Sequence, residues 1–223
     1  MVGTLESSPA PTVCAVVVTY NPDLPVLMPL LEQLERSHCD YVVVDNHSGN
    51  QDALRAAVQG HTHLVRLVAN DANIGQASAL NLALDEVRQH QYTLALLFDQ
   101  DSSIGPDFLG KLLEAWNEAV SLSAGKVAAI GPRLEEPRSG RRMPFRTFRQ
   151  LLERQEAAVP TSATRLIDTA FLITSGSLIS MDALAQIGLM RADYFIDNVD
   201  LEWCFRARHK GYHLYGTDHA TLQ

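Results

Sequence analysis

The stretch Val13–Thr19 (VCAVVVT) is a continuous run of apolar side chains, most of them β-branched. Such a run is typical of a strand buried on both faces of a parallel sheet, because a half-exposed strand alternates apolar and polar residues. Leucines then recur every three or four residues within 25–37, which predicts a helix, and 41–44 is a second short apolar run that ends at Asp45. Together these segments predict a β-α-β unit.

Helices and strands keep alternating further along the chain. The pattern predicts helices over 52–59, 75–90 and 106–122, and strands over 64–68, 92–98 and 127–130. This alternation is typical of a doubly wound, mostly parallel α/β sheet, whose ligand crevice lies beyond the carboxyl ends of the strands. Polar residues follow four of the strands at these ends: Tyr20-Asn21, Asp45-Asn46, 70–73 and 99–101. We therefore expect them to line a ligand site.

Length and charge bound the class of protein. The 223 residues, 46% of them hydrophobic, suffice for one large domain, which we expect over 12–223. Residues 1–11 lack the basic start and apolar run of a signal peptide and are predicted to form a disordered leader. A net charge of −8 disfavours binding to nucleic acid, since that affinity comes mainly from Lys and Arg that neutralise phosphates.

The three cysteines, Cys14, Cys39 and Cys204, lie far apart and lack the spacing of a disulfide framework or a zinc site. A reducing compartment such as the cytoplasm is therefore favoured. No run approaches the roughly 18 apolar residues of a membrane span, so the sequence predicts a soluble protein. A peripheral contact with the inner face of the plasma membrane stays open.

The regular pattern breaks between 132 and 164. Six arginines fall within 133–149, and apolar periodicity is weak until a short helix predicted over 148–157. We interpret this stretch as a mobile lid. Helices are predicted again over 181–187 and 198–210, and Gly211 closes the second of these.

The segment 94–101 (LALLFDQD) is an apolar strand that runs directly into two carboxylates one residue apart. Asp99 and Asp101 repel each other unless a cation lies between them or water screens them. Mg²⁺ and Mn²⁺ prefer oxygen ligands, and either ion would let the pair anchor a nucleotide diphosphate. The alternative is a solvated acidic turn.

Six motifs occur in order along the chain: 17–23 (VVTYNPD), 42–48 (VVVDNHS), 73–81 (NIGQASALN), 98–101 (FDQD), 174–180 (TSGSLIS) and 195–206 (FIDNVDLEWCFR). In this combination the chain resembles the family 2 glycosyltransferases, and within them the bacterial rhamnosyltransferases. The resemblance covers nearly the whole chain from about Val13 onward. It implies the GT-A fold, in which a nucleotide-binding α/β half is joined to an acceptor-binding half.

The resemblance implies that Thr19, Tyr20 and Asn21 line the nucleotide pocket and that Asp45 accepts a hydrogen bond from the base. A carboxylate can accept from the imino N–H of uracil or thymine, which agrees with this role. Asn46 would add a second polar contact. The alternative for Asp45 is that it caps the next helix or turn.

Two glycines and an asparagine are assigned to the donor in the same way. In Asn73-Ile74-Gly75 the glycine permits close backbone approach, and the following helix offers N–H groups to an anionic or polyhydroxyl ligand; the alternative is a simple turn. Gly176 would let the backbone approach the donor sugar, or would mark a bulge in a strand.

The family pattern further implies that Asp101 binds the metal directly and that Asp99 reaches the ribose or the metal. The general base would be Asp200, with Asp197 as its competitor because Val199 stands where many relatives have glutamate. Asp200 and Glu202 are two positions apart and cannot share one helix face.

These residues predict an inverting, metal-dependent glycosyltransferase. It would transfer L-rhamnose from dTDP-rhamnose, or another sugar from a UDP- or dTDP-sugar, to a hydroxyl of a saccharide or glycolipid. The alternative is a nucleotide-sugar-binding module without activity. The resemblance also implies a metal-binding histidine shortly after 219–222, so a chain that ends at Gln223 is expected to be truncated at its C-terminus or to lack that part naturally.

Overall fold

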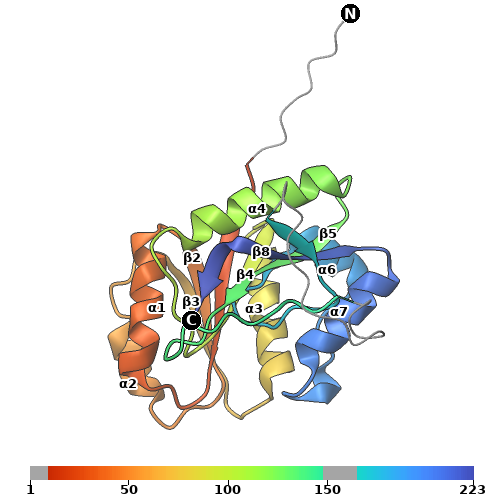
Figure 1. The fold of residues 1–223 in the computed structure, drawn as a ribbon. Coiled ribbons are helices and arrows are strands. Elements are labelled where there is room, and N and C mark those ends of the chain that lie inside the picture. The colour runs from red at the N-terminus through yellow and green to blue at the C-terminus, as the bar shows by residue number, and fades with distance from the viewer. Residues whose placement is uncertain (1–9, 148–164) are drawn as a thin grey trace, which may run out of the picture.

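The computed structural model describes residues 10–147 and 165–223, so most of the predicted leader and the helix predicted over 148–157 lie outside the described residues. An eight-stranded mixed sheet, in the order β3-β2-β1-β4-β7-β5-β8-β6, is flanked by helices (Figure 1). This is the α/β class predicted from the alternation of strands and helices.

The first half of the chain forms the parallel part of the sheet. Its elements are β1 (Val13–Thr19), α1 (Leu24–Arg36), β2 (Asp40–Asp45), α2 (Gln51–Ala57), β3 (Leu64–Ala69), α3 (Gln76–Gln89) and β4 (Leu94–Asp99). Strand β1 runs parallel to both β2 and β4, and β2 runs parallel to β3. The predicted β-α-β pattern is therefore confirmed over this half.

The second half adds strands of both directions. It contains α4 (Phe108–Leu122), β5 (Val127–Leu134), β6 (Leu166–Asp168), β7 (Leu178–Ser180), α6 (Met181–Ile187), the 3₁₀ turn η1 (Ala192–Tyr194), α7 (Val199–His209) and β8 (His213–Leu222). Strand β7 lies antiparallel between β4 and β5, while β8 runs parallel to β5 and antiparallel to β6. The sheet is thus mixed, and its purely parallel part is confined to the first four strands.

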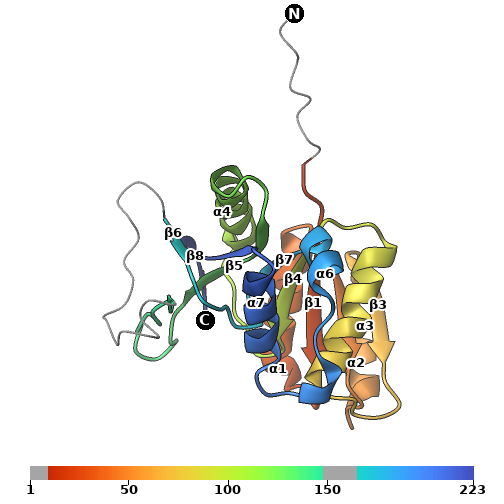
Figure 2. The same cartoon turned by 90° about the vertical axis from the view of Figure 1, so that its right-hand side faces the viewer.

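The core lies on both faces of the sheet, because successive β1 residues point to opposite sides. Cys14 and Val16 pack with buried residues of α3, α6 and α7, helices that lie on one side of the sheet in Figure 2. Ala15 and Val17 pack with residues of α1, α2 and α4. This two-faced burial explains why the run is apolar up to Thr19, which is itself buried and donates to Asp45.

The predicted mobile lid wrongly includes Arg133. This arginine lies in β5 and is buried, and its Nε and Nη2 donate to the Asp218 carboxylate over 2.6 and 3.1 Å. Its Nη1 donates to the Met143 carbonyl, and its guanidinium lies 4.2 Å from the centre of the Phe145 ring. The prediction was wrong here because a buried charge is held by a partner far away in sequence.

No helix within 10–147 or 165–223 is long and apolar enough to cross a lipid bilayer.

Candidate active site

The carboxyl ends of three parallel strands meet at one edge of the sheet. Thr19 is the register partner of Asp45, and Val18 is the partner of Asp99. Polar residues that are far apart in sequence therefore become neighbours, as expected for the ligand edge of a doubly wound sheet.

A cleft of about 250 Å³ opens at this edge. Six residues predicted to bind the donor line it: Thr19, Tyr20, Asn46, Asn73, Gly75 and Asp99. The other lining residues are Val18, Gln76, Gln100, Phe195 and Ile196. The remaining predicted site residues, Asn21, Asp45, Asp101, Gly176 and Asp200, are not part of this lining. The cleft thus gathers residues from both halves of the chain.

Asp99 is the most perturbed carboxyl group of the cleft. Burial first, and then the charges of Asp101 and Asp200, raise the pKa of Asp99 to about 6, against a lowering effect of the hydrogen bond from Gln76. That bond joins Gln76 Nε2 to Asp99 Oδ1 over 3.0 Å. The start of α7 lies close to the end of β4, because Thr174 N donates to Asp200 Oδ2 and the next residue, Ser175, accepts at Oγ from Asp99 N.

The chemistry of Asp99 and Asp101 fits a hard divalent cation. Two carboxylates next to each other, one of them partly buried, would be relieved of their repulsion by a bound Mg²⁺ or Mn²⁺. Among the residues that the structure describes, no group of three His, Cys, Asp or Glu side chains is arranged as metal ligands. Mg²⁺ usually keeps several waters and takes one or two carboxylates together with substrate phosphates, so a pair of acids is sufficient for this kind of site.

We expect Asp99→Asn to stabilise the metal-free protein by about 1 to 3 kcal/mol at pH 7, because the raised pKa corresponds to a carboxylate that is costly to keep charged. Asparagine keeps an oxygen for the bond from Gln76. Urea unfolding in the presence of EDTA measures the change.

The same reasoning sets the pH dependence of this gain. A carboxyl whose folded pKa lies above its ordinary value of 3.8 makes the wild type lose stability as the pH rises from about 4 through about 6. The gain from Asp99→Asn should therefore be near zero at pH 3.5 and largest above pH 7. Equal or lower stability of the variant at pH 7 would contradict this account.

Asp45 is fully buried and accepts four hydrogen bonds from its own chain. Thr19 Oγ1 and Ser48 Oγ donate to Oδ1, over 3.0 and 2.5 Å, while Ser48 N and Gln51 Nε2 donate to Oδ2, each over 2.9 Å. Burial alone would raise the pKa of Asp45, but these bonds outweigh it and hold the pKa below its usual value. In this structure Asp45 organises the turn before α2, and contact with a base requires one of its partners to move.

Two asparagines of the predicted nucleotide site bind each other. Asn46 Nδ2 donates to Asn73 Oδ1 over 2.8 Å, and Asn46 Oδ1 accepts from Asn70 Nδ2 and Ile74 N. Asn73 Oδ1 also accepts from Gly75 N over 3.0 Å. The pair therefore fixes the loop between β3 and α3 and still borders the cleft.

Asn21 ties the end of β1 to the turn after β2. Its backbone N–H donates to Ser48 Oγ over 2.7 Å, and its Oδ1 accepts from Gly49 N over 2.8 Å. The side chain is thus held beside the cleft without lining it.

Gly75 allows a close approach, and the group that approaches it is Phe195. A Cβ at position 75 would lie 2.6 Å from Phe195 Cδ2 and 2.8 Å from the Phe195 carbonyl oxygen. The same carbonyl accepts a hydrogen bond from Ala77 N over 3.1 Å, so it uses one of the free N–H groups at the start of α3. Gly75 has a φ of +82° and a ψ of 161°, a conformation almost confined to glycine.

Close packing also explains why position 176 is a glycine. Its φ is +78°, and a Cβ there would lie 2.6 Å from Pro132 Cγ and 3.3 Å from Leu222 Cδ2. Its N–H donates to the Leu97 carbonyl over 2.7 Å, which extends the pairing between β7 and β4. Contact with a donor sugar stays a prediction for this residue.

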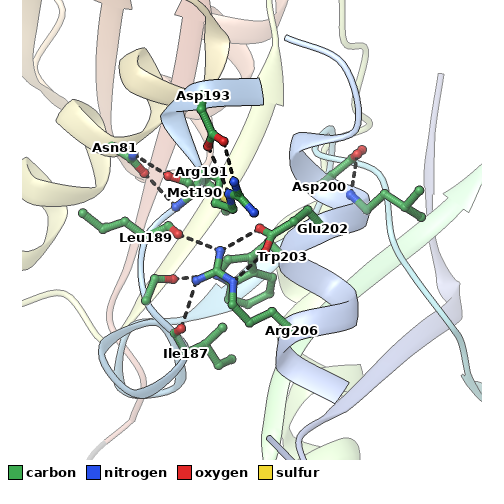
Figure 3. A network of polar contacts seen from close by, with 12 residues as sticks. Asn81, Ile187, Leu189, Met190, Arg191, Asp193, Asp200, Glu202, Trp203 and Arg206 are labelled. Carbon is green, nitrogen blue, oxygen red and sulfur yellow. Dashed lines mark hydrogen bonds and ion pairs between the residues drawn. The ribbon is translucent and has the colours of Figure 1, made fainter. Parts of the chain in front are cut away.

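Asp200 lies in the first turn of α7 and is held by two backbone donors. Thr174 N donates to Oδ2 over 3.1 Å and Leu201 N donates to Oδ1 over 2.7 Å. Figure 3 shows Asp200 pointing away from Glu202, which binds Arg206 Nε and Nη2 over 2.9 and 2.8 Å. This agrees with the expectation that the two acids do not share a helix face. Asp197, the competing candidate, is exposed.

A polar network anchors α7 and the loop before it (Figure 3). Arg206 donates to the carbonyls of Ile187 and Leu189, and Trp203 Nε1 donates to the Gly188 carbonyl over 2.9 Å. Asn81 of α3 binds both backbone groups of Met190. The helix that carries Asp200 is therefore fixed to the end of α6 and the loop that follows it, and Asn81 fixes the same loop to α3.

Sequence reasoning missed several residues that shape the site. Gln76 contacts Asp99, and Gln100 Oε1 accepts from Tyr20 N over 2.8 Å. Both glutamines lie inside recognised motifs, 73–81 and 98–101, and this position was the only available signal. Phe195 opens the recognised motif 195–206, but its approach to Gly75 joins positions far apart in the chain and had no signal in the sequence.

The chain is similar in sequence to known proteins. The model of the family described as glycosyl transferase family 2 matches residues 14–186, more than half of the chain. The chain belongs to the family 2 glycosyltransferases. It is 29% identical over 197 residues to the dTDP-rhamnosyl transferase RfbF of Shigella flexneri, a match that covers 88% of this chain and 63% of that protein. The chain therefore spans less than two thirds of this curated relative.

Solved structures confirm the GT-A fold of this glycosyltransferase. The mannosyltransferase PcManGT of Pyrobaculum calidifontis, solved with GDP-Man and Mn²⁺, has a TM-score of 0.67 at 22% identity, with 95% of this chain and 56% of that chain covered. S. aureus TarS has a TM-score of 0.66 at 16% identity, with 93% and 35% covered. At these identities the similarity concerns the fold alone.

Proposed function

We propose that this glycosyltransferase transfers L-rhamnose from dTDP-rhamnose to a hydroxyl of a glycan or glycolipid, with inversion at the anomeric carbon. The observation that carries the proposal is that Asp99 lines the cleft and lies close to Asp200: Asp99 N donates to Ser175 Oγ, and the preceding residue, Thr174, donates its N–H to Asp200 Oδ2. Asp101 follows Asp99 by two positions, and its charge and that of Asp200 add to the effect of burial in raising the pKa of Asp99. A carboxylate pair that can hold a divalent cation, beside a separate base, is what a direct displacement from a nucleotide diphosphate needs.

Each acid has a separate task in this mechanism. Asp99 and Asp101 would hold Mg²⁺ or Mn²⁺, which supplies positive charge to the departing diphosphate. Asp200 takes the proton of the acceptor hydroxyl while that oxygen attacks the anomeric carbon and the bond to the diphosphate breaks. The backbone donors Thr174 N and Leu201 N keep the carboxylate of Asp200 in one orientation. Inversion follows because no second carboxylate is assigned as a nucleophile.

The base of the donor is assigned to the pocket formed by Thr19, Tyr20 and Asp45, with Asn46 beside it. For Asp45 to accept from the imino N–H of thymine or uracil, one of its present donors must leave. We assign this to Gln51, whose long, flexible side chain donates to Oδ2. The carboxylate then exchanges one N–H donor for another, so the buried Oδ2 keeps a hydrogen-bond donor.

The rhamnosyl donor is supported by the similarity to the dTDP-rhamnosyl transferase of Shigella flexneri. We place the reaction in the cytoplasm, because all three cysteines are free and buried in the described structure. The second function that stays open is binding of a nucleotide sugar without transfer, which would need the cleft but not Asp200.

A panel of nucleotide sugars with and without Mn²⁺ tests the proposal by thermal unfolding. A ligand present at about 100 times its dissociation constant adds about 2.7 kcal/mol, which for a chain of this size raises Tm by roughly 5–10 °C. We expect this shift for dTDP-rhamnose with Mn²⁺ and little shift in EDTA. A shift with NAD or GDP-mannose alone would contradict the assigned donor.

A further inference from the structure

The cleft has an apolar wall that carries no hydrogen-bonding side chain. Phe195 and Ile196 both line it, yet these residues remain 49% and 57% exposed. When a ligand covers large apolar side chains that contact water inside a cleft, the burial of this apolar surface favours binding. The wall therefore points to an apolar part of the ligand.

The position of this wall is imposed by the surrounding structure. Phe195 has a φ of 59° and a ψ of −68°, which is unfavourable for a residue with a bulky side chain. Its carbonyl is held by Ala77 N over 3.1 Å, and the ring fits only because Gly75 has no Cβ. Backbone strain of this kind persists where several contacts determine it together, and it is concentrated at ligand sites.

In the proposed function, the wall borders the space assigned to the transferred sugar. In the proposed function the diphosphate is held at Asp99 and Asp101, and the sugar lies between it and Asp200. Phe195 and Ile196 line the same cleft as Asp99 and precede Asp200 by only a few residues, on the segment that leads into α7. The side chains that border the sugar from this direction are thus apolar.

We infer that Phe195 and Ile196 contact C6 of the transferred sugar and select a 6-deoxyhexose, which has a methyl group there, over a sugar with a hydroxymethyl group. This inference rests on the proposed function and assigns its specificity. A hydroxyl against this wall loses hydrogen bonds to water and finds no partner on either side chain. Apolar sites reject an added hydroxyl only moderately, so the expected preference is about tenfold to a hundredfold.

The test uses two donors that differ only at C6, namely dTDP-L-rhamnose and dTDP-L-mannose. Calorimetric titration of each into the wild type with Mn²⁺ should show at least about tenfold tighter binding of the rhamnose donor. Ile196→Ser and Phe195→Ser give the wall a hydroxyl and should reduce the preference below about threefold. Tyr20→Ala is the control: it removes a 50% exposed aromatic side chain from the same cleft, and it should weaken both donors equally.

The outcomes separate the two proposals. Equal binding of the two donors by the wild type, or an unchanged preference in Ile196→Ser, overturns the assignment of the wall and leaves the proposed function standing. Binding of neither donor by the wild type overturns the proposed function and this inference with it. Thermal unfolding checks each variant, and Ile196→Ser decides alone if Phe195→Ser does not fold, because Ile196 has no strained backbone conformation.

Discussion

Replacing Asp200 by asparagine is expected to slow sugar transfer at least about a hundredfold while leaving donor affinity nearly unchanged. A hydroxyl is a poor nucleophile at neutral pH, and a positioned general base contributes roughly 10²- to 10⁴-fold. The amide keeps the size of the side chain and an oxygen for the bond from Thr174 N, so the helix end should stay in place. Turnover is measured as dTDP released from dTDP-rhamnose with an acceptor that the wild type uses, and donor affinity is measured by calorimetry.

Asp197→Asn is the matched control for this experiment. It removes the same charge from an exposed position three residues earlier, on the same segment. If Asp197→Asn causes the loss and Asp200→Asn does not, the base is Asp197. If neither slows transfer, or if the product keeps the anomeric configuration of the donor, the displacement mechanism itself is wrong.

The sequence predicted the part of the fold that depends on local pattern. The run Val13–Thr19 has the predicted bounds because a strand buried on both faces is apolar throughout, and its neighbours follow the same rule. Strand β8 was missed because His213, Gly216 and Asp218 interrupt its apolar pattern. The antiparallel direction of β7 and its place between β4 and β5 were not predicted, because a strand of three residues does not indicate which strands it joins.

The site residues, too, could be predicted where their position depends on local sequence, and not where it depends on contacts between residues far apart in the chain. The strand-end position of Asp45 and Asp99 follows from a simple rule about parallel sheets, so sequence reasoning could place both residues. The arginine at 133 was misinterpreted because its partner Asp218 lies 85 positions away. The contact between Gly75 and Phe195 was likewise invisible: the glycine predicted a close approach, but only the fold determines which group approaches.

Donor binding is expected to weaken by more than about a hundredfold when divalent metal is removed or when Asp101 is replaced by asparagine. A diphosphate brings negative charge to an edge that already carries Asp99, Asp101 and Asp200; burial, and then the charges of Asp101 and Asp200, raise the pKa of Asp99. A bound divalent cation changes this interaction by several kcal/mol, which corresponds to more than two powers of ten in affinity. Calorimetry with dTDP in Mn²⁺, and then in EDTA, measures the effect of the metal directly.

Asp107→Asn serves as the control, because it removes the same charge from an exposed residue that pairs with Lys111 outside the donor cleft. Its affinity for dTDP with Mn²⁺ should equal that of the wild type. The wild type in EDTA and Asp101→Asn in Mn²⁺ should be weakened to a similar extent, and EDTA should have little further effect on Asp101→Asn. Binding of dTDP that is as tight in EDTA as in Mn²⁺ would show that the carboxylate pair does not act through a cation, because three acids without one would repel the diphosphate.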